Sequence, residues 1–209
     1  MIGVFGGTFD PIHFGHLRTG LDLFEALQLT ELRWVPAAQP AHRDSPHADA
    51  HQRLAMVEMA IAGQPGFIAD DRQLRRDGPS YMVDTLFSIR AQIGPNRPLC
   101  LVIGADAYAG LNTWSRWETL LDHAHLVVMT RPGAPRVATE IHAWSGAHQA
   151  GDLSSLQLNP SGTVWFQTVT ALTISASDIR ARIAAGLSPR YLLPESVAEY
   201  ISEHGLYRP

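Results

Sequence analysis

Two histidines near the start of the sequence, His13 and His16, have the residue type and spacing of a phosphate-binding site. They lie three positions apart, so both imidazole rings can point the same way in the first turn of a helix. Gly15 between them removes side-chain bulk beside a ligand. The adjacent Gly6 and Gly7 permit positive φ and let backbone N–H groups approach an anion closely. Together these groups suit a polyphosphate bound at a helix N-terminus.

The elements that must position these residues follow from the pattern of hydrophobicity. Short apolar runs alternate with longer segments of helical period, which is typical of βαβ units around a parallel sheet. The runs expected as strands are 2–5, 32–35, 67–69, 99–103, 126–129 and 164–166. Crossover helices are expected near 17–27, 54–61 and 82–89, and a last helix from Pro194 to Gly205. Ligands bind at the carboxyl ends of strands in such sheets, which is where the two histidines follow the first run.

Two stretches lack this periodicity and are expected to be loops. The first is 36–46, rich in Pro, Ala and His, and the second is 131–162, with a short helix around 139–144. Loops of this length in a compact domain are usually functional. No repeat, low-complexity tract or linker divides the sequence, so residues 1–209 are expected to form a single domain.

Composition excludes several classes of function. The formal net charge of -4 provides no global positive field for nucleic acid or for an anionic membrane. All 16 basic residues are Arg, which removes the P-loop and Schiff-base enzymes, because both need a Lys. Cys100 is the single cysteine and lies in an apolar run, so no disulfide framework forms and the thiol is expected to be buried and inert. The N-terminal segment has no basic region followed by a long apolar stretch, and no segment approaches 18 apolar residues, so a cytoplasmic location is expected.

The string from Gly6 to His16 resembles the nucleotidyltransferase superfamily marked by His-x-Gly-His, and in particular the bacterial nicotinate-nucleotide adenylyltransferases. The segment 174–180 is similar to the second signature of that family, a Ser-rich turn that opens a helix and closes over the ATP phosphates. Ser175 and Ser177 are natural N-caps, and their hydroxyls and the helix N-terminus can donate to phosphate oxygens. The resemblance implies a Rossmann-like open parallel sheet flanked by helices, with a small C-terminal helical extension.

The resemblance also implies two binding sites. It places an ATP site at Gly6, Gly7, Thr8, Phe9, His13, His16, Gly104, Asp106, Arg131, Ile174, Ser175, Ser177 and Arg180. It places a mononucleotide site at Thr8, His42, Arg43, Ser80, Tyr81, Met82 and Trp114. Two positions depart from the family pattern: Ala41 replaces the second proline of Pro-Pro-His-Arg, and Met82 replaces the Thr of Pro-Ser-Tyr-Thr.

The implied reaction joins ATP and nicotinate mononucleotide into deamido-NAD and pyrophosphate. His13 and His16 are expected to be the catalytic residues, with His16 at the α-phosphate and His13 at the neighbouring phosphates. Asp106 is expected at the ribose and Trp114 against the pyridine ring. Mg²⁺ is expected to arrive with ATP rather than in a protein cage, and Asp10 is expected to orient the turn. A monomer or small homo-oligomer without nucleic-acid or membrane partners is expected.

Other interpretations remain open at this point. Trp114 and Trp117 could both be core residues on one helical segment, Asp106 could be a helix N-cap, and Arg43 and Arg131 could be solvated. Other enzymes with His-x-Gly-His, acting on nicotinamide mononucleotide, phosphopantetheine or cytidine nucleotides, are the nearest functional alternatives. Aminoacyl-tRNA synthetases are set aside because their signature loop contains Lys. A metal-binding protein using His42, His47 and His51, and a nucleotide-binding regulator without activity, are alternatives of other classes.

Overall fold

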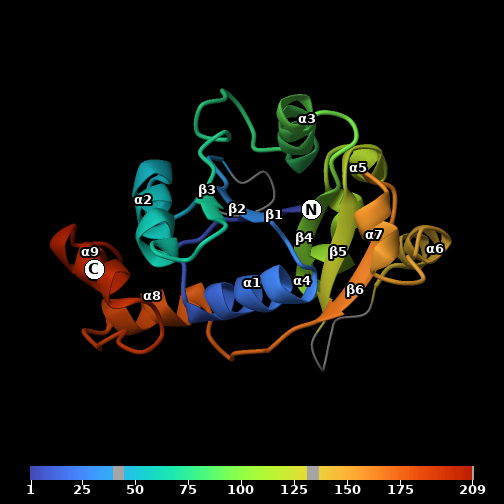
Figure 1. Ribbon diagram of the computed structural model, residues 1–209. Helices are drawn as coiled ribbons and strands as arrows, with labels where there is room; N and C mark the ends of the chain where they lie inside the picture. Colours follow the sequence, from blue (N-terminus) through green and yellow to red (C-terminus); the bar gives the residue numbers. More distant parts are fainter. Residues whose placement is uncertain (40–44, 131–136, 209) are drawn as a thin grey trace.

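A six-stranded parallel sheet organises the computed structural model, which describes residues 1–39, 45–130 and 137–208. The strands are β1 (Ile2–Gly7), β2 (Glu31–Pro36), β3 (Phe67–Ala69), β4 (Leu99–Gly104), β5 (His125–Thr130) and β6 (Val164–Thr168). Their order is β3-β2-β1-β4-β5-β6, so the strand order reverses between β1 and β4 (Figure 1). Each expected run is a strand, and the expected open parallel sheet is confirmed. The reversal creates the crevice in which α/β proteins bind ligands.

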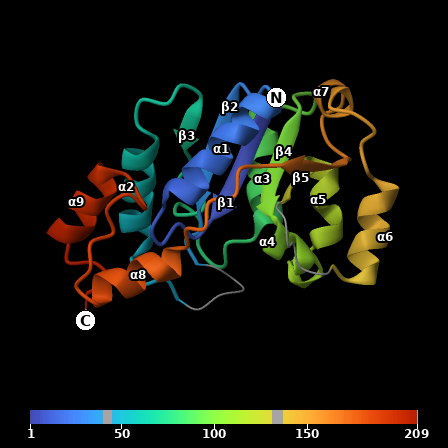
Figure 2. The same cartoon turned by 90° about the horizontal axis from the view of Figure 1, so that it is seen from below.

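Helices cover both faces of this sheet, as Figures 1 and 2 show. The α-helices are α1 (Phe14–Ala26), α2 (Ala50–Ile61), α3 (Met82–Ile93), α4 (Ala105–Ala109), α5 (Leu120–His123), α6 (Thr139–Ala147), α7 (Ser154–Leu158), α8 (Ala176–Ala184) and α9 (Glu195–Glu203). Two short 3₁₀ helices are η1 (Leu111–Thr113) and η2 (Trp117–Thr119). Helices α1, α2, α7, α8 and α9 share one buried cluster, while α3, α4, α5 and α6 share another. None of the helices in the described ranges is long and apolar enough to cross a membrane.

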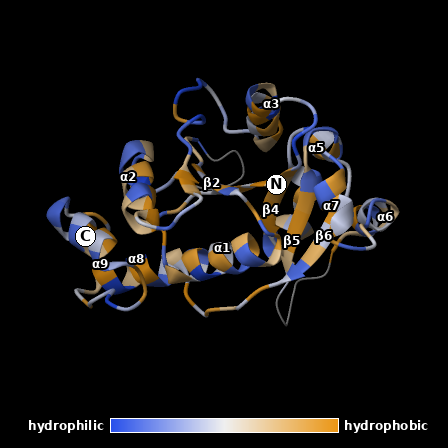
Figure 3. Ribbon diagram, viewed as in Figure 1, coloured by the Kyte–Doolittle hydropathy of each residue, from blue (hydrophilic) through white to orange (hydrophobic). Residues whose placement is uncertain are grey.

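Successive side chains of a strand point to opposite faces of the sheet, and this alternation produces the two clusters. In β1, Ile2 and Val4 belong to the cluster on the α3 side, while Phe5 belongs to the cluster on the α1 side. Hydrophobic residues line β4 and β5 in Figure 3, in agreement with strands buried on both faces. Burial on both faces explains why these strands appear in the sequence as continuous apolar runs.

The short helix expected around 139–144 is confirmed as α6, but the rest of the stretch 131–162 is not one loop, because it also contains α7. Two helices, α6 and α7, occupy this stretch, and only residues 131–136 of it lie outside the described part. Ile141 and Ser145 bury one side of α6, and Leu156 buries one side of α7. With so few apolar residues, neither helix carries the periodic signal of a crossover helix.

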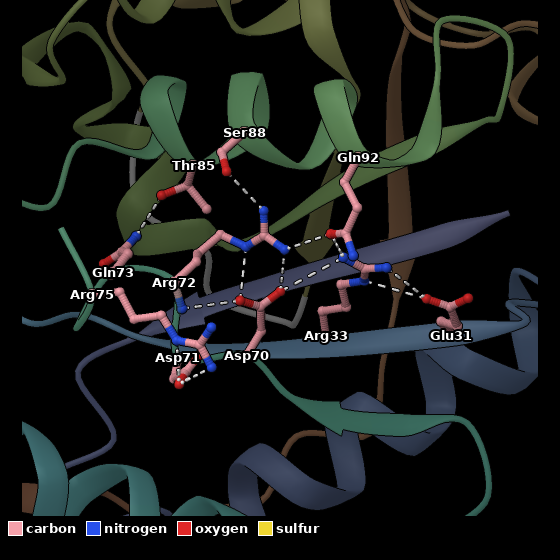
Figure 4. Close-up of polar contacts among 10 residues, drawn as sticks. All are labelled: Glu31, Arg33, Asp70, Asp71, Arg72, Gln73, Arg75, Thr85, Ser88 and Gln92. Atoms are coloured by element: carbon pink, nitrogen blue, oxygen red, sulfur yellow. Dashed lines mark hydrogen bonds and ion pairs between the residues drawn. The ribbon is translucent and has the colours of Figure 1, made fainter.

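A buried polar network joins the edge of the sheet to α3 (Figure 4). Asp70, which follows β3, accepts two hydrogen bonds from the guanidinium group of Arg72, each 2.7 Å long. The guanidinium group of Arg33 in β2 lies 3.7 Å from the same carboxylate. Arg72 also donates to Ser88 and Gln92 on α3. The two guanidinium groups offset the loss of water around the buried carboxylate. The network therefore holds α3, which begins beside the expected mononucleotide site, against β2 and β3.

Candidate active site

Gly6 and Gly7 end β1 at the reversal of strand order, and neither has the positive φ that the sequence suggested. Their missing Cβ atoms make room for other side chains instead. A Cβ at Gly6 would overlap the Met82 methyl group, and a Cβ at Gly7 would lie 2.8 Å from the Phe9 ring. Close approach of side chains, rather than backbone conformation, is what these glycines provide.

Phe9 is the residue of this turn that adopts a left-handed conformation, with φ of 50°. Such a conformation costs a residue other than glycine about 1–2 kcal/mol. The Phe9 ring is 2% exposed and packs 5.9 Å from Phe5 and 5.7 Å from Trp34, ring centre to ring centre. It also meets His16 edge-to-face at 5.2 Å. Burial of the ring therefore holds the strained turn and supports one side of the His16 imidazole.

The rings of His13 and His16 stack 3.7 Å apart at 26°, which confirms that both point the same way. His13 is the N-cap residue of α1 and is 5% exposed. Burial lowers the pKa of His13 from 6.5 to about 4, so its imidazole is neutral at physiological pH. Its Nδ1 is buried and has no hydrogen-bond partner among the described residues. The ring is thus a neutral hydrogen-bonding group rather than a cation.

The second signature lies directly beside the first. A Cβ on Gly15 would be 3.4 Å from the carbonyl oxygen of Ile174, and Arg180 donates to the carbonyl oxygen of Asp10 at 2.7 Å. Ser175 is the N-cap of α8, as expected, because its Oγ accepts from the backbone N–H of Asp178, whereas Ser177 lies in the first turn of α8 and is not a cap. The Ser175 and Ser177 hydroxyl oxygens are 3.1 Å apart. The fold thus joins two segments that are about 160 residues apart in the sequence.

Three of the expected mononucleotide residues, Ser80, Tyr81 and Met82, lie at the start of α3, whereas Thr8 follows β1. Ser80 Oγ accepts hydrogen bonds from the backbone N–H groups of Ala38 and Gln39, each 3.1 Å long, and so ties the loop after β2 to α3. Tyr81 is the N-cap residue of α3, and the Met82 side chain lies over Gly6. This edge of the site therefore adjoins the end of β1. His42, Arg43 and Arg131 lie outside the described residues.

Gly104 and Asp106 lie at the end of β4, and Trp114 follows a few residues later. Their local structure bears on two alternatives that the sequence left open, a cap at Asp106 and a shared helix for the tryptophans. Gly104 is the N-cap of α4 and Asp106 lies in its first turn, so Asp106 is not the cap. Trp114 follows η1 in an extended conformation, and Trp117 lies in η2, so the two do not share one helix. Trp114 and Trp117 are both partly buried against the cluster on the α3 side, and Trp117 also packs edge-to-face on Trp144 at 5.0 Å.

The chain has extensive similarity to known proteins. A model of the cytidylyltransferase-like family matches residues 4–182. A relative from Aeromonas hydrophila subsp. hydrophila, named "probable nicotinate-nucleotide adenylyltransferase", is 47% identical over 209 residues, which are 100% of this chain and 97% of the relative. The chain belongs to the nicotinate-nucleotide adenylyltransferase family. A protein of the same name from Pseudomonas fluorescens is 48% identical over 208 residues, covering 99% of this chain and 97% of that relative.

A solved structure supports the fold of this family member. The nicotinic acid mononucleotide adenylyltransferase of Plasmodium falciparum, complexed with NaAD, matches with a TM-score of 0.75. The match covers 99% of this chain and 96% of that chain at 16% sequence identity. At 16% identity, this match supports the arrangement of the sheet and helices and nothing further.

Sequence reasoning missed Arg53, a buried residue that joins three segments around the site of this adenylyltransferase. It is 1% exposed and donates to the carbonyl oxygens of Thr8 at 2.8 Å, Ala48 at 3.1 Å and Ala38 at 3.3 Å. Burial lowers the pKa of Arg53, and the negative charge of Asp10 offsets part of this shift. The spacing of residues in the sequence could have indicated that Arg53 is buried, because it lies on the same face of α2 as Met56, Val57 and Ile61.

The metal-binding alternative finds no support in the described ranges, where no three His, Cys, Asp or Glu side chains are grouped as a metal site needs. His47 precedes α2, whose N-cap is Asp49, so His47 and His51 are not one turn apart on a helix. The His47 backbone N–H and ring Nδ1 both face Asp10, at 2.9 Å and 3.5 Å. Asp10 thus orients the turn, as expected, by hydrogen bonds that connect it to the start of α2.

Proposed function

We propose that the chain transfers the adenylyl group of ATP to nicotinate mononucleotide, giving deamido-NAD and pyrophosphate in NAD biosynthesis. The observation that carries this proposal is the stacked pair of His13 and His16 beside the Ser175-capped helix α8, at the reversal of strand order. The full-length similarity to relatives of that name supports the substrate assignment.

The residues present suit a reaction that needs positioning and charge stabilisation. The mononucleotide phosphate attacks the α-phosphorus in line; one P–O bond forms and the bond to pyrophosphate breaks. That phosphate is already an anion, because its second pKa is about 6, so no protein nucleophile or general base is required. His16 stabilises the charge on the α-phosphate, and neutral His13 donates a hydrogen bond to a neighbouring phosphate. Ser175, Ser177 and the N-terminus of α8 hold the remaining phosphate oxygens.

We assign the other roles by the same reasoning. Gly104 and Asp106 hold the adenosine side, Ser80, Tyr81 and Met82 the nicotinate side, and Trp114 stacks on the pyridine ring. Backbone groups of Gly6, Gly7, Thr8 and Phe9 line the phosphates, next to Ile174. Arg180 adds positive charge from α8, and Arg43, Arg131 and His42 complete the set in our proposal. The whole sequence 1–209 then acts as one domain, because both signature segments serve the same site.

Mg²⁺ fits this site as a companion of ATP rather than as a resident ion. Both carboxylate oxygens of Asp10 accept hydrogen bonds from the protein, and the surrounding groups are imidazoles, hydroxyls and guanidinium groups. The phosphate oxygens of ATP and water therefore hold the ion, which neutralises phosphate charge when bound. We further infer a monomer or small homo-oligomer in the cytoplasm that acts on small molecules.

A pyrophosphate-release assay tests the proposal. The purified chain is incubated with ATP, Mg²⁺ and one acceptor: nicotinate mononucleotide, nicotinamide mononucleotide, phosphopantetheine or glycerol phosphate. Release with nicotinate mononucleotide, at least about tenfold faster than with the amide, is expected, and a tenfold ratio corresponds to a barrier difference of about 1.4 kcal/mol. A preference for the amide or for phosphopantetheine would replace the proposal by that alternative.

A further inference from the structure

The carboxylate of Asp10 gathers donors from distant parts of the chain. It is 5% exposed; its Oδ1 accepts from the Ala48 N–H at 3.1 Å and from the Tyr207 hydroxyl at 2.7 Å. Its Oδ2 accepts from the His47 N–H at 2.9 Å. Arg180 donates to the Asp10 carbonyl oxygen at 2.7 Å, and its Nη1 lies 3.8 Å from Oδ2. Neutral donors thus hold the carboxylate by hydrogen bonds, while Arg180 hydrogen-bonds to the carbonyl oxygen and forms only a longer ion pair with Oδ2.

Tyr207 reaches Asp10 because the chain turns back after α9. The N–H of Leu206 bonds to the carbonyl oxygen of Ile201, and Tyr207 adopts a left-handed φ of 62°. This turn brings the end of the chain beside α8 (Figure 2). The partly buried Tyr207 ring packs against the cluster on the α1 side, and its centre lies 6.4 Å from that of His47. The hydroxyl is therefore held at Asp10 by packing as well as by its hydrogen bond.

A carboxylate and a guanidinium form the strongest hydrogen bonds available to either group. Without the Tyr207 hydroxyl, Oδ1 would lose a short bond and Arg180 would be drawn from the carbonyl oxygen onto the carboxylate. Arg53 also contributes positive charge near Asp10, and the His47 ring lies 3.5 Å from Oδ2. Arg53 is fixed by its hydrogen bonds to three carbonyl oxygens, so we expect the change to fall mainly on Arg180, whose Nη1 already lies near the carboxylate. Burial and the charge of Asp10 raise the pKa of Tyr207, which keeps its hydroxyl protonated.

We propose that Tyr207 is a positioning residue for adenylyl transfer, which keeps Arg180 directed to the ATP phosphates by occupying Oδ1 of Asp10. Apart from Nη1, the guanidinium nitrogens of Arg180 have no hydrogen-bond partner among the described residues. They are the atoms that would meet the triphosphate. This inference rests on the proposed function, and specifically on the role assigned there to Arg180.

The test compares Tyr207→Phe with a matched control, Tyr200→Phe. Tyr200 belongs to α9, its ring stacks on His204, and its hydroxyl has no hydrogen bond to the described residues. Tyr207→Phe should raise the KM for ATP about fivefold, the scale of one lost hydrogen bond, and change the KM for the mononucleotide less than about twofold. The Kd of a non-hydrolysable ATP analogue, measured by calorimetry, should rise by the same factor. Tyr200→Phe should leave both constants unchanged.

A double-mutant cycle with Arg180→Gln separates this inference from the proposed function. In the Arg180→Gln background, Tyr207→Phe should add less than about twofold to the KM for ATP, because the group it positions is gone. Equal increases in the KM of both substrates, or full additivity of the two changes, would mean a structural role only and overturn the inference. If Arg180→Gln leaves ATP binding unchanged, the role assigned to Arg180 fails. If it weakens ATP binding while Tyr207→Phe does not, only the positioning role is wrong.

Discussion

Burial decides what His13 contributes to the site. With its pKa lowered to about 4 by burial, the imidazole is neutral before a phosphate binds, although a histidine at a phosphate site suggests a cation. A buried imidazolium beside the positive end of α1 would be unfavourable without a bound anion. Permanent positive charge therefore has to come from arginines such as Arg180, since the chain contains no Lys.

Removal of the His16 imidazole tests the centre of the proposed mechanism. We expect His16→Ala to lower kcat by about 10²-fold or more, which is the effect of losing one donor to the transition state. The fold should survive, because the neighbouring Phe9 and Phe5 rings pack on Trp34 as well. Steady-state kinetics and a thermal melt check both points. Turnover close to that of the native chain would contradict the assignment.

Trp114 offers a test of the acceptor side. If its ring stacks on the pyridine, Trp114→Ala should raise the KM for nicotinate mononucleotide about tenfold and that for ATP much less, since aromatic stacking on a base contributes about 1–3 kcal/mol. Trp117→Ala is the matched control, because Trp117 is partly buried against the same cluster and packs on Trp144, but is not expected at the pyridine ring. Parallel increases in the two KM values would identify Trp114 as a packing residue.

At the scale of elements, the contact between the start of α1 and the segment before α8 brings the two signatures together. Gly15 makes it possible, because a Cβ there would lie 2.9 Å from the His13 ring and 3.4 Å from the carbonyl oxygen of Ile174. The backbone of Ile174 cannot move as freely as a side chain. The glycine thus sets both the position of His13 and the distance between α1 and the second signature.

Gly15→Ala should therefore impair activity more than stability. We expect kcat/KM for ATP to fall about tenfold or more, because a displacement of a catalytic ring by about 1 Å can cost as much as 10²-fold. Gly146→Ala in α6 is the matched control: a Cβ there meets nothing within 4 Å, and Ala in a helix is more stable than Gly by about 1 kcal/mol. Unchanged kinetics in Gly15→Ala would refute the steric argument.

The elements themselves were predictable where burial on both faces leaves an apolar run. The strands β1, β2, β4 and β5 follow from this pattern. The edge strands β3 and β6 are apolar runs that are only partly buried, and the helices α1, α2, α3 and α9 follow from apolar residues at helical spacing. Helix α7 could not be predicted, because it buries only Leu156, and α6 is longer than expected for the same reason. The left-handed Phe9 carries no sequence signal either, since tertiary packing of its ring imposes that conformation.

At the scale of the whole molecule, the contacts that complete the site cross most of the sequence. Arg180 and Asp10 are 170 residues apart, and Tyr207 and Asp10 are 197 apart. Local patterns place each residue on a helix or in a turn but do not say which distant segments meet. The resemblance to the family led us to expect both signature segments at one site, and contacts of Gly15 with Ile174 and of Asp10 with Arg180 join these segments. It did not supply Tyr207 or Arg53, which lie outside the signature motifs.

Buried histidines also make the stability of the whole chain depend on pH. Burial lowers the pKa of His13 in the site and of His125 at the start of β5. The unfolded chain then binds protons that the folded chain does not, so the free energy of unfolding falls as the pH drops below the ordinary value of 6.5. For His13 alone the loss is about 2 kcal/mol between about pH 7.5 and pH 5. His125 adds to it in the same direction.

Urea unfolding at these two pH values measures the effect. His13→Gln should lower the unfolding free energy at neutral pH through altered packing, yet reduce its loss on acidification by about 2 kcal/mol relative to the native chain. The matched control is His51→Gln, at an exposed position of α2, which should leave the acid-induced loss unchanged. With ATP bound, the loss of unfolding free energy on acidification should not become larger in either His13→Gln or His51→Gln. If His13→Gln loses as much stability on acidification as the native chain, burial does not lower the pKa of His13, and the assignment of a neutral donor on that ground would be wrong.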